Sequence, residues 1–429
     1  MKILLAFLAA LLLATPASAD AIEWRDGLWF DGNSFVPGTR WTVGDVFVAR
    51  SPKRVDRVVN LGRQYVVPAF GDAHHHGIDS AEGLDLKIDA FLEAGIFYVK
   101  NPNVIADLIT PEVRVKLSRP SSIDVAFSNG GLTSSGGHPA PLQNYLASIG
   151  VFPGLKAEDM ENRAYFFIDS EAGLDAKWPR ILAGKPDFIK AFIGFSDHGA
   201  ENRMPPYGYR GLDPKLLPAV ARKAHGSGLR ISAHIDTATD FRNAVAAGVD
   251  EINHLPSPDP RFSPDLSAYV IDEATAKLAA ERGIVVVTTA STTERLSGGA
   301  LGEAWVRGMR ENQVANLKTL RAAGVRLAIG SDGISGERTF ATARDEVRFL
   351  AANKMLDNLT LLRMWSQETP RTIFPKRRLG ALEPGYEADF LVLAGNPLED
   401  TTNLERISMR VKSGWVLPPM VPVVLRRAD

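Results

Sequence analysis

Three consecutive histidines, His74, His75 and His76, follow the apolar run Tyr65-Val66-Val67-Pro68. Successive side chains of an extended segment point to opposite sides, so His74 and His76 share one direction and His75 faces the other way. Imidazoles that share a direction can chelate one metal ion, because the neutral imidazole nitrogen is a common metal ligand. We therefore expect His74 and His76 to bind one ion, and His75 to pack outward or against a neighbouring domain.

Further polar side chains stand at the ends of apolar runs later in the chain. One histidine in such a place is usually a hydrogen-bonded core or loop residue. Five runs that each present a metal-binding group are more specific, because the carboxyl ends of barrel strands meet at one face of the fold. After the first run, the groups are Lys190, His234, His254 and the pair Ser331-Asp332.

Lys190 is unusual in this set because it lies within the apolar run Phe188-Ile189-Lys190-Ala191-Phe192. A buried ammonium would need a counter-charge and would repel a dication. A buried lysine whose pKa is lowered can instead be neutral and react with carbon dioxide, and the resulting carbamate is an anionic oxygen bridge for two metals. The alternative is that Lys190 pairs with a carboxylate such as Asp332.

The elements that must position these residues alternate between short apolar runs and helical patterns, which predicts βα units and a parallel sheet. The expected strands are residues 66–70, 96–100, 123–127, 188–193, 230–234, 251–254, 284–288 and 327–330. The clearest expected helices are residues 214–225, 237–247, 272–282 and 303–323. Eight βα units over about 250 residues is the number in a (β/α)8 TIM barrel, an α/β fold. A doubly wound open sheet is the alternative.

Both chain ends read as β-rich, with turn residues between short strands. Residues 20–66 and 375–429 are therefore expected to form one composite β domain, and residues 67–374 the barrel. Residues 1–19 have a basic start, an apolar core over 3–13 and a small-residue ending, which is the layout of a cleaved secretory signal. An uncleaved anchor is the alternative, but the core is shorter than the ~20 residues that span a bilayer. We expect an exported protein, periplasmic or secreted, with no stable membrane anchor after cleavage.

The composition narrows the range of partners. The 429 residues include 49 basic and 50 acidic side chains, a formal net charge of -1. No bulk field therefore attracts nucleic acid or an anionic membrane, and the expected partner is a small-molecule substrate. The absence of cysteine removes disulfides and thiolate metal ligands. The sequence leaves the oligomeric state open, and a homo-oligomer is possible.

Taken together, these residues resemble the metal-dependent amidohydrolase superfamily, in particular its imidazolonepropionase-like and Xaa-Pro dipeptidase branch. The resembling stretches are PAFGDAHHH at 68–76, Lys190, His234, VDEINH at 249–254, GSDG at 330–333 and LGALEPGYEADFLVL at 379–393. The resemblance implies a (β/α)8 barrel, a small β-sandwich made from both chain ends and two divalent metal ions, usually Zn²⁺. It assigns His74, His76 and Asp332 to one ion, His234 and His254 to the other, and a carboxylated Lys190 as the bridge.

The expected activity is hydrolysis of carbon–nitrogen amide bonds in small molecules such as dipeptides or N-acyl amino acids. A metal-bridging hydroxide is available near neutral pH, because each cation lowers the pKa of bound water. Asp332 is expected to take the proton of this nucleophile and return it to the leaving nitrogen. An esterase, lactonase or phosphotriesterase on the same binuclear site is the alternative. A non-catalytic relative is disfavoured, because the chain retains every expected ligand.

His138, in SSGGHP at 134–139, follows the third expected strand. It resembles the histidine that lies by the substrate carbonyl in this branch, where it could stabilise an oxyanion. The chain departs from the branch in having Pro139 where a glycine is common, which leaves the substrate open. The remaining candidate substrate contacts lie in the long loop after Lys190, since such loops set specificity. They are His198, Tyr207, Tyr209 and Arg210.

Overall fold

The computed structural model of the chain describes residues 20–197, 210–256, 265–292, 302–334 and 341–419. The expected signal segment, residues 1–19, lies outside the described residues. Within the described ranges, no helix is long and apolar enough to cross a membrane.

Parallel strands run through the middle of the chain and form two sheets, so the fold is α/β. The first has three strands in the order β6-β8-β9, and the second has seven in the order β11-β10-β12-β13-β14-β15-β16. Seven of the eight expected strands are confirmed to within one residue at each end, whereas the short strands β10 and β11 were not expected. The strands are β6 (Phe70–Asp72), β8 (Ile96–Asn101), β9 (Asp124–Phe127), β10 (Gly131–Thr133), β11 (Tyr165–Phe167), β12 (Phe188–Phe192), β13 (Arg230–His234), β14 (Glu251–Asn253), β15 (Val285–Thr288) and β16 (Arg326–Ile329).

Backbone hydrogen bonds also join these two sheets at two points. The amide of Ala73, just after β6, donates to the carbonyl of Ile329 in β16 at 2.9 Å. The amide of Asp187, just before β12, donates to the carbonyl of Phe127 in β9 at 2.8 Å. Beyond β6 and β16, the short strands β7 (His75–His76) and β17 (Gly333–Ile334) pair in parallel. The residues that follow β6 therefore lie beside those that follow β16.

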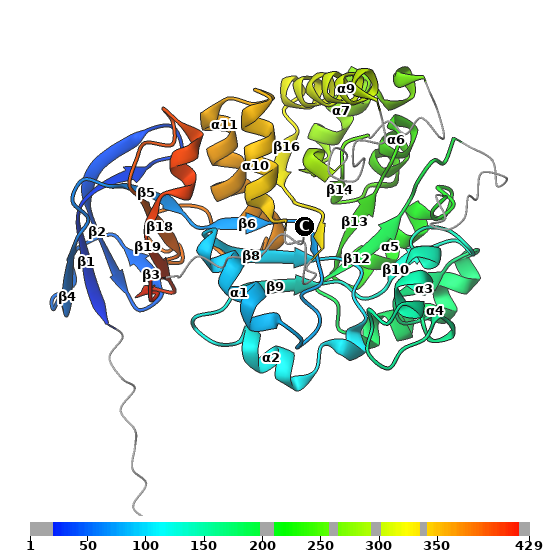
Figure 1. The fold of residues 1–429 in the computed structure, drawn as a ribbon, viewed down its shortest axis with the longest axis horizontal. Coiled ribbons are helices and arrows are strands. Elements are labelled where there is room, and N and C mark those ends of the chain that lie inside the picture. The colour runs from blue at the N-terminus through cyan, green and yellow to red at the C-terminus, as the bar shows by residue number, and fades with distance from the viewer. Residues whose placement is uncertain (1–19, 198–209, 257–264, 293–301, 335–340, 420–429) are drawn as a thin grey trace, which may run out of the picture.

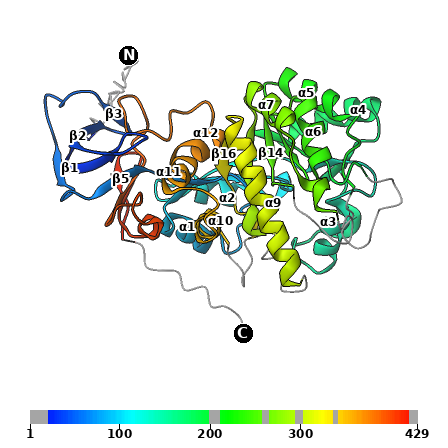
Figure 2. The same ribbon diagram turned by 90° about the horizontal axis from the view of Figure 1, so that it is seen from above.

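The expected helices connect these strands, and their ends follow from local capping. The Thr237 side chain accepts from the amide of Asp240 at the start of α6, and Gly248 ends that helix with φ 76°. The Asp272 side chain accepts from the amide of Thr275 at the start of α7. Helices α4 to α7 lie at the end of the molecule farthest from β1 and β2 (Figures 1 and 2). The helices that match the expected ones are α5 (Leu217–Gly226), α6 (Ala238–Ala247), α7 (Glu273–Glu281) and α9 (Glu303–Ala322), whereas α4 (Glu171–Ala183) was not among them.

Strands from both chain ends share one eight-stranded sheet (Figure 1), in which β1 pairs with β2, β4 and β5. The pairing in this sheet is mixed, because β2 pairs with β1 antiparallel while β4 and β5 pair with it in parallel. An aromatic cluster fills this region, and the ring of Phe390 lies 4.9 Å from that of Trp24. The strands are β1 (Ala21–Phe30), β2 (Phe35–Val43), β3 (Val46–Val48), β4 (Arg57–Asn60), β5 (Tyr65–Pro68), β18 (Phe390–Leu393), β19 (Ile407–Lys412) and β20 (Trp415–Val416).

The first expected strand, residues 66–70, is divided between two sheets, which corrects the sequence prediction. Up to Pro68 the chain pairs with β18 in the eight-stranded sheet. The amide of Ala69 still donates to Asp389 of that region, but the amide of Phe70 donates to Gly95 at the start of β8. Pro68 has no amide hydrogen, so its position suits the point where pairing changes partner.

Candidate metal centre

Three side chains that follow β6 and β16 converge on one point. Nε2 of His74 lies 3.4 Å from Oδ1 of Asp332, and Nε2 of His76 lies 3.2 Å from the same oxygen. Two ligands about 2.0 Å from a tetrahedral ion are about 3.3 Å apart, so these separations match donors that share one cation. The three side chains are therefore candidates to hold one divalent cation.

Two more histidines extend this cluster. The ring of His254 lies 4.8 Å from that of His74 and 4.5 Å from that of His234. Ligand atoms of His74, His254 and Asp332 all lie within 4.8 Å of one another. The two expected ligand sets therefore form one continuous cluster, with His254 beside both of them. Nδ1 of His254 lies 2.6 Å from Oγ1 of Thr289, which fixes the ring and leaves Nε2 free to bind.

The backbone turns sharply at two of these residues. His254 and Asp332 have φ values of 77° and 45°, in the left-handed region that is costly for residues other than glycine. His254 follows directly on β14, and Asp332 lies between β16 and β17, so the turn at each residue directs its side chain toward the cluster. Gly330 passes so close that a Cβ there would lie 2.8 Å from Cβ of His74. Close approach of β16 to His74 thus requires a glycine at this point.

Burial keeps the imidazoles neutral, which is their metal-binding form. Burial, and then the charge of Lys190, lowers the pKa of His74 and of His234 to about 3. Burial raises the pKa of Asp332, but hydrogen bonds from His74 and His76 outweigh it and hold this pKa well below its usual range. Nδ1 of His74 is buried and has no hydrogen-bond partner among the described residues. Neutral donors beside one ionised carboxylate form a suitable donor set for a divalent cation.

Lys190 lies in the middle of β12 with 1% of its surface exposed. Its Nζ atom donates a hydrogen bond to Oδ1 of Asn253 and lies 5.0 Å from the centre of the Phe192 ring. Burial lowers the pKa of Lys190 from 10.5 to about 7. Within the described part of the chain, Lys190 forms no ion pair with a carboxylate, so the expected alternative of pairing with Asp332 is not what this structure contains.

His75 points away from the cluster and is fully buried. Its ring packs edge-on against Phe91 of α1 (Leu84–Glu93) at 4.9 Å, and Nδ1 lies 3.1 Å from Oγ of Ser331. Asp72, for which no role was predicted, supports the same region. Its carboxylate accepts from the amides of His74, Ser331 and Ala343 at 3.3, 3.0 and 2.9 Å. Asp72 thus ties the histidine strand to the segment that carries Asp332.

A second carboxylate near the histidines was also missed. Oδ2 of Asp236 lies 3.2 Å from Nε2 of His234. The two residues are two positions apart at the end of β13, so the alternation that singled out His74 and His76 could have found Asp236.

The expected substrate contacts are only partly covered by the described residues. The ring of His138 lies 5.2 Å from those of His234 and Phe192, so it borders the cluster. The carbonyl of Arg210 accepts from the amide of His138 at 3.0 Å. His198, Tyr207 and Tyr209 lie outside the described residues.

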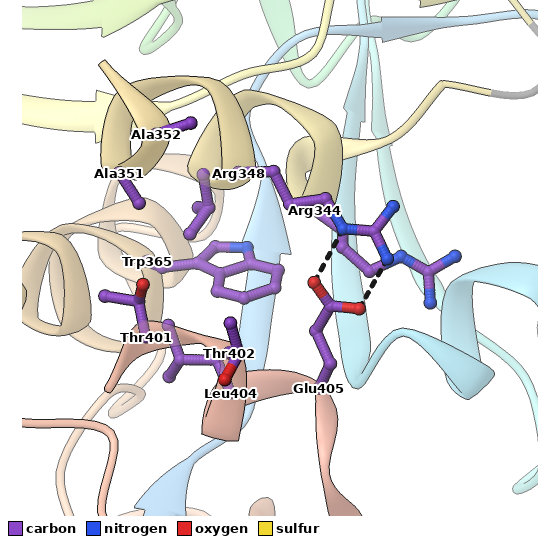
Figure 3. A pocket seen from close by; sticks show the side chains of 10 residues that line it. Arg344, Arg348, Ala351, Ala352, Trp365, Thr401, Thr402, Leu404 and Glu405 are labelled. Atoms are coloured by element: carbon purple, nitrogen blue, oxygen red, sulfur yellow. Dashed lines mark hydrogen bonds and ion pairs between the residues drawn. The ribbon is translucent and has the colours of Figure 1, made fainter. Parts of the chain in front are cut away.

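A pocket of about 380 Å³ lies elsewhere, beside α10 (Ala343–Ala352) and η6 (Thr401–Glu405) (Figure 3). Its two arginines are already paired. Arg348 binds both carboxylate oxygens of Glu405, and Nη1 of Arg344 lies 2.7 Å from Oε2 of Glu93. None of the expected site residues lines this pocket, so the chemistry is assigned to the histidine cluster. The lining residues are Arg344, Val347, Arg348, Ala351, Ala352, Trp365, Thr401, Thr402, Leu404 and Glu405.

Comparison with known proteins agrees with the family resemblance seen in the sequence. The sequence profile of the Amidohydrolase family matches residues 65–421. Ochratoxinase from Aspergillus niger is 26% identical over 196 residues, which are 44% of this chain and 37% of that protein. The crystal structure of A. niger ochratoxinase has a TM-score of 0.72 at 18% identity, and the match covers 93% of this chain and 96% of that one. A Xaa-Pro dipeptidase with bound methionine has a TM-score of 0.70 at 17% identity, covering 93% and 100%. At these low sequence identities, the two structural matches show a shared fold.

Proposed function

This chain belongs to the amidohydrolase family, and from that premise we propose that it is a metal-dependent hydrolase of amide bonds in small molecules. The observation that carries the proposal is the convergence of His74 and His76 on one carboxylate oxygen of Asp332. An ionised carboxylate beside imidazole nitrogens is the donor set of a hydrolytic metal site.

Two divalent ions, with Zn²⁺ the leading choice, are assigned to this cluster. His74, His76 and Asp332 would hold one, and His234 and His254 the other. His254 also borders the first set, so it lies where the two sets meet. A carboxylated Lys190 would supply the bridging oxygens, and its low pKa supports reaction of the neutral amine with carbon dioxide.

Bound divalent ions would supply Lewis acidity that polarises the substrate carbonyl and acidifies water. The protein's own groups then handle protons and orientation. The ionised carboxylate of Asp332 accepts the proton of the attacking water and delivers it to the leaving nitrogen, which leaves poorly unless it is protonated. His138, at the edge of the cluster, is placed to donate a hydrogen bond to the developing oxyanion.

The finer architecture and the location of the protein are also part of the proposal. The parallel strands would close into a (β/α)8 barrel, supported by the bonds from Ala73 to Ile329 and from Asp187 to Phe127. Residues 67–374 would form it, and residues 20–66 with 375–429 the small β-sandwich domain. Export to the periplasm or medium would follow cleavage of residues 1–19, and a homo-oligomer is compatible with all of these assignments.

The substrate class is proposed from the chemistry of the site together with the comparisons. One similar protein is an ochratoxinase and another is a Xaa-Pro dipeptidase. Dipeptides and N-acyl amino acids, in which an acyl group is joined to an amino acid nitrogen, are therefore the first candidates for this chain.

The test is a substrate screen of the purified, zinc-loaded protein, preceded by metal analysis. Dipeptides, N-acyl amino acids, lactones and phosphotriesters would be compared by kcat/KM. Turnover of the first two classes at least tenfold above the others is expected. Preference for lactones or phosphotriesters would reject amide hydrolysis, and protein that binds no divalent ion would reject the metal-dependent reaction altogether.

A further inference from the structure

Five buried polar side chains lie together on strands β8, β12, β13 and β14, and we call them the polar layer. Each is at most 4% exposed. Charged groups this deep are costly unless they are paired and hydrogen-bonded, so their mutual contacts must be specific. The members of the polar layer are Lys100, Lys190, Ser232, Glu251 and Asn253.

The two lysines of the polar layer have different partners. Nζ of Lys100 donates to both carboxylate oxygens of Glu251, at 2.7 and 2.8 Å. Burial raises the pKa of Glu251, but the charges of Lys100 and Arg230 outweigh this and bring it to about 2. Nζ of Lys190 instead donates to Oδ1 of Asn253, which is a neutral acceptor. The one carboxylate of the polar layer, that of Glu251, therefore forms its ion pair with Lys100 and not with Lys190.

Glu251 also fixes the orientation of the Asn253 amide. Nδ2 of Asn253 donates to Oε1 of Glu251 at 2.9 Å, and an ionised carboxylate can only accept. Oγ of Ser232 lies 2.7 Å from Oδ1 of Asn253 and 2.8 Å from Oε1 of Glu251, and its single hydrogen serves one of these two acceptors. The amide therefore has one satisfied orientation, in which its oxygen faces Lys190.

We propose that Asn253 is a positioning residue for the carboxylation of Lys190, an inference that rests on the proposed function. In this reaction the amine lone pair of Nζ forms a bond to the carbon of carbon dioxide, one C=O electron pair moves to oxygen, and one N–H proton passes to water. The carbamate nitrogen keeps a single hydrogen. Asn253 Oδ1 accepts that hydrogen, so the same contact orients Lys190 before and after the modification and leaves both carbamate oxygens free.

The experiment compares the unaltered protein with Asn253→Leu, which removes the acceptor, and Asn253→Ala, which removes it without adding bulk. Carbamate would be measured by ¹³C NMR of protein equilibrated with ¹³C-bicarbonate, and bound zinc by elemental analysis, both without substrate. At ambient bicarbonate we expect the carbamate-to-amine ratio of the variants to fall on the order of tenfold, the equivalent of about 1.4 kcal/mol. Raised bicarbonate should restore much of the signal and of the bound zinc by mass action.

Asn316→Leu is the matched control. Asn316 is equally buried, on α9, and its amide bonds to the backbone of Ile271 and Tyr269. This variant should lose stability and keep the full carbamate signal. A folded Asn253 variant with the same carbamate occupancy as the unaltered protein would overturn the inference while leaving the proposed function intact. Absence of carbamate from the unaltered, zinc-loaded protein would instead reject the bridging lysine itself.

Discussion

Oδ1 of Asp332 lies 3.2 Å from Nε2 of His76, although 256 residues separate them in the chain. The parallel pairing of β17 with β7 brings the two segments together. Asp332 keeps an ionised carboxylate there because the hydrogen bonds from His74 and His76 outweigh its burial. One carboxylate is therefore available both to hold a cation and to accept a proton.

Asp332→Asn should abolish most turnover and leave the fold intact. The amide keeps the size of the side chain but cannot accept and return a proton. We expect kcat to fall on the order of 10²–10⁴-fold, measured on the best substrate, with an unchanged circular dichroism spectrum. Asp236→Asn is the matched control, because Asp236 is similarly exposed and contacts His234. Equal losses in both variants would contradict a specific proton-transfer role for Asp332.

Removal of metal by a chelator should abolish activity and lower the melting temperature. A ligand present at 100 times its Kd stabilises the folded state by about 2.7 kcal/mol, and this contribution disappears with the metal. Differential scanning calorimetry with and without added Zn²⁺ measures the shift. His74→Ala should show a smaller zinc-dependent shift than the unaltered protein. Full activity after exhaustive chelation would reject the metal-dependent mechanism.

His138→Ala should lower kcat without changing bound zinc. Loss of one oxyanion donor typically costs about 10²–10³ in kcat, whereas His138 is not among the assigned metal ligands. Kinetics and elemental analysis on the same preparation separate the two roles. His225→Ala is the control, because His225 is exposed and pairs with Asp250 at 2.9 Å. Parallel loss of zinc and activity at His138 would place this residue among the ligands instead.

The metal-free protein should lose stability as the pH falls below about 6.5. His74 and His234 take up protons in the unfolded chain near pH 6.5, but in the folded protein only near pH 3. Between these values the unfolded state binds more protons, so the free energy of unfolding decreases on acidification. The slope should approach about 1.4 kcal/mol per pH unit for each histidine. Burial raises the pKa of Asp72 to about 7, which gives a slope of opposite sign in this window, so urea unfolding at pH 4 to 7 is compared between the unaltered protein and His74→Ala. Identical profiles would contradict a buried neutral His74.

The strands and the main ligand cluster could be predicted because local rules decide them. Alternation along an extended segment separates His74 and His76 from His75. Apolar runs bounded by turn residues marked seven strands to within one residue. The division at Ala69 could not be seen in the same way, because a continuous apolar run carries no sign of which neighbouring strand it will join.

The polar layer could not be predicted, because its contacts depend on tertiary structure. Lys100 and Glu251 are 151 residues apart and come within hydrogen-bond distance only in the folded chain. The residues around Asn253 in the sequence do not indicate that it contacts Lys190. From the sequence alone, Asn253 is only the residue before the expected ligand His254. Asp236 is different, since its spacing from His234 was visible and only its significance was missed.

Lys190→Met should make the metal-free protein more stable while it abolishes zinc binding. A pKa lowered from 10.5 to about 7 corresponds to a burial penalty of roughly 4–5 kcal/mol. Methionine removes this penalty but takes the Lys190 donor away from Oδ1 of Asn253, which costs about 1–3 kcal/mol. A net gain on the order of 2 kcal/mol is expected from urea unfolding near pH 7.

Lys100→Met is the matched control, and it should change the free energy of unfolding in the opposite direction. It removes the same kind of side chain from the same polar layer, but it leaves the buried carboxylate of Glu251 without its cation. Removing one partner of a buried ion pair costs about 3–5 kcal/mol, so this variant should be clearly less stable than the unaltered protein. If both variants changed stability in the same direction, the two lysines would not differ in charge state, and the assignment of Lys190 as the reactive amine would be wrong.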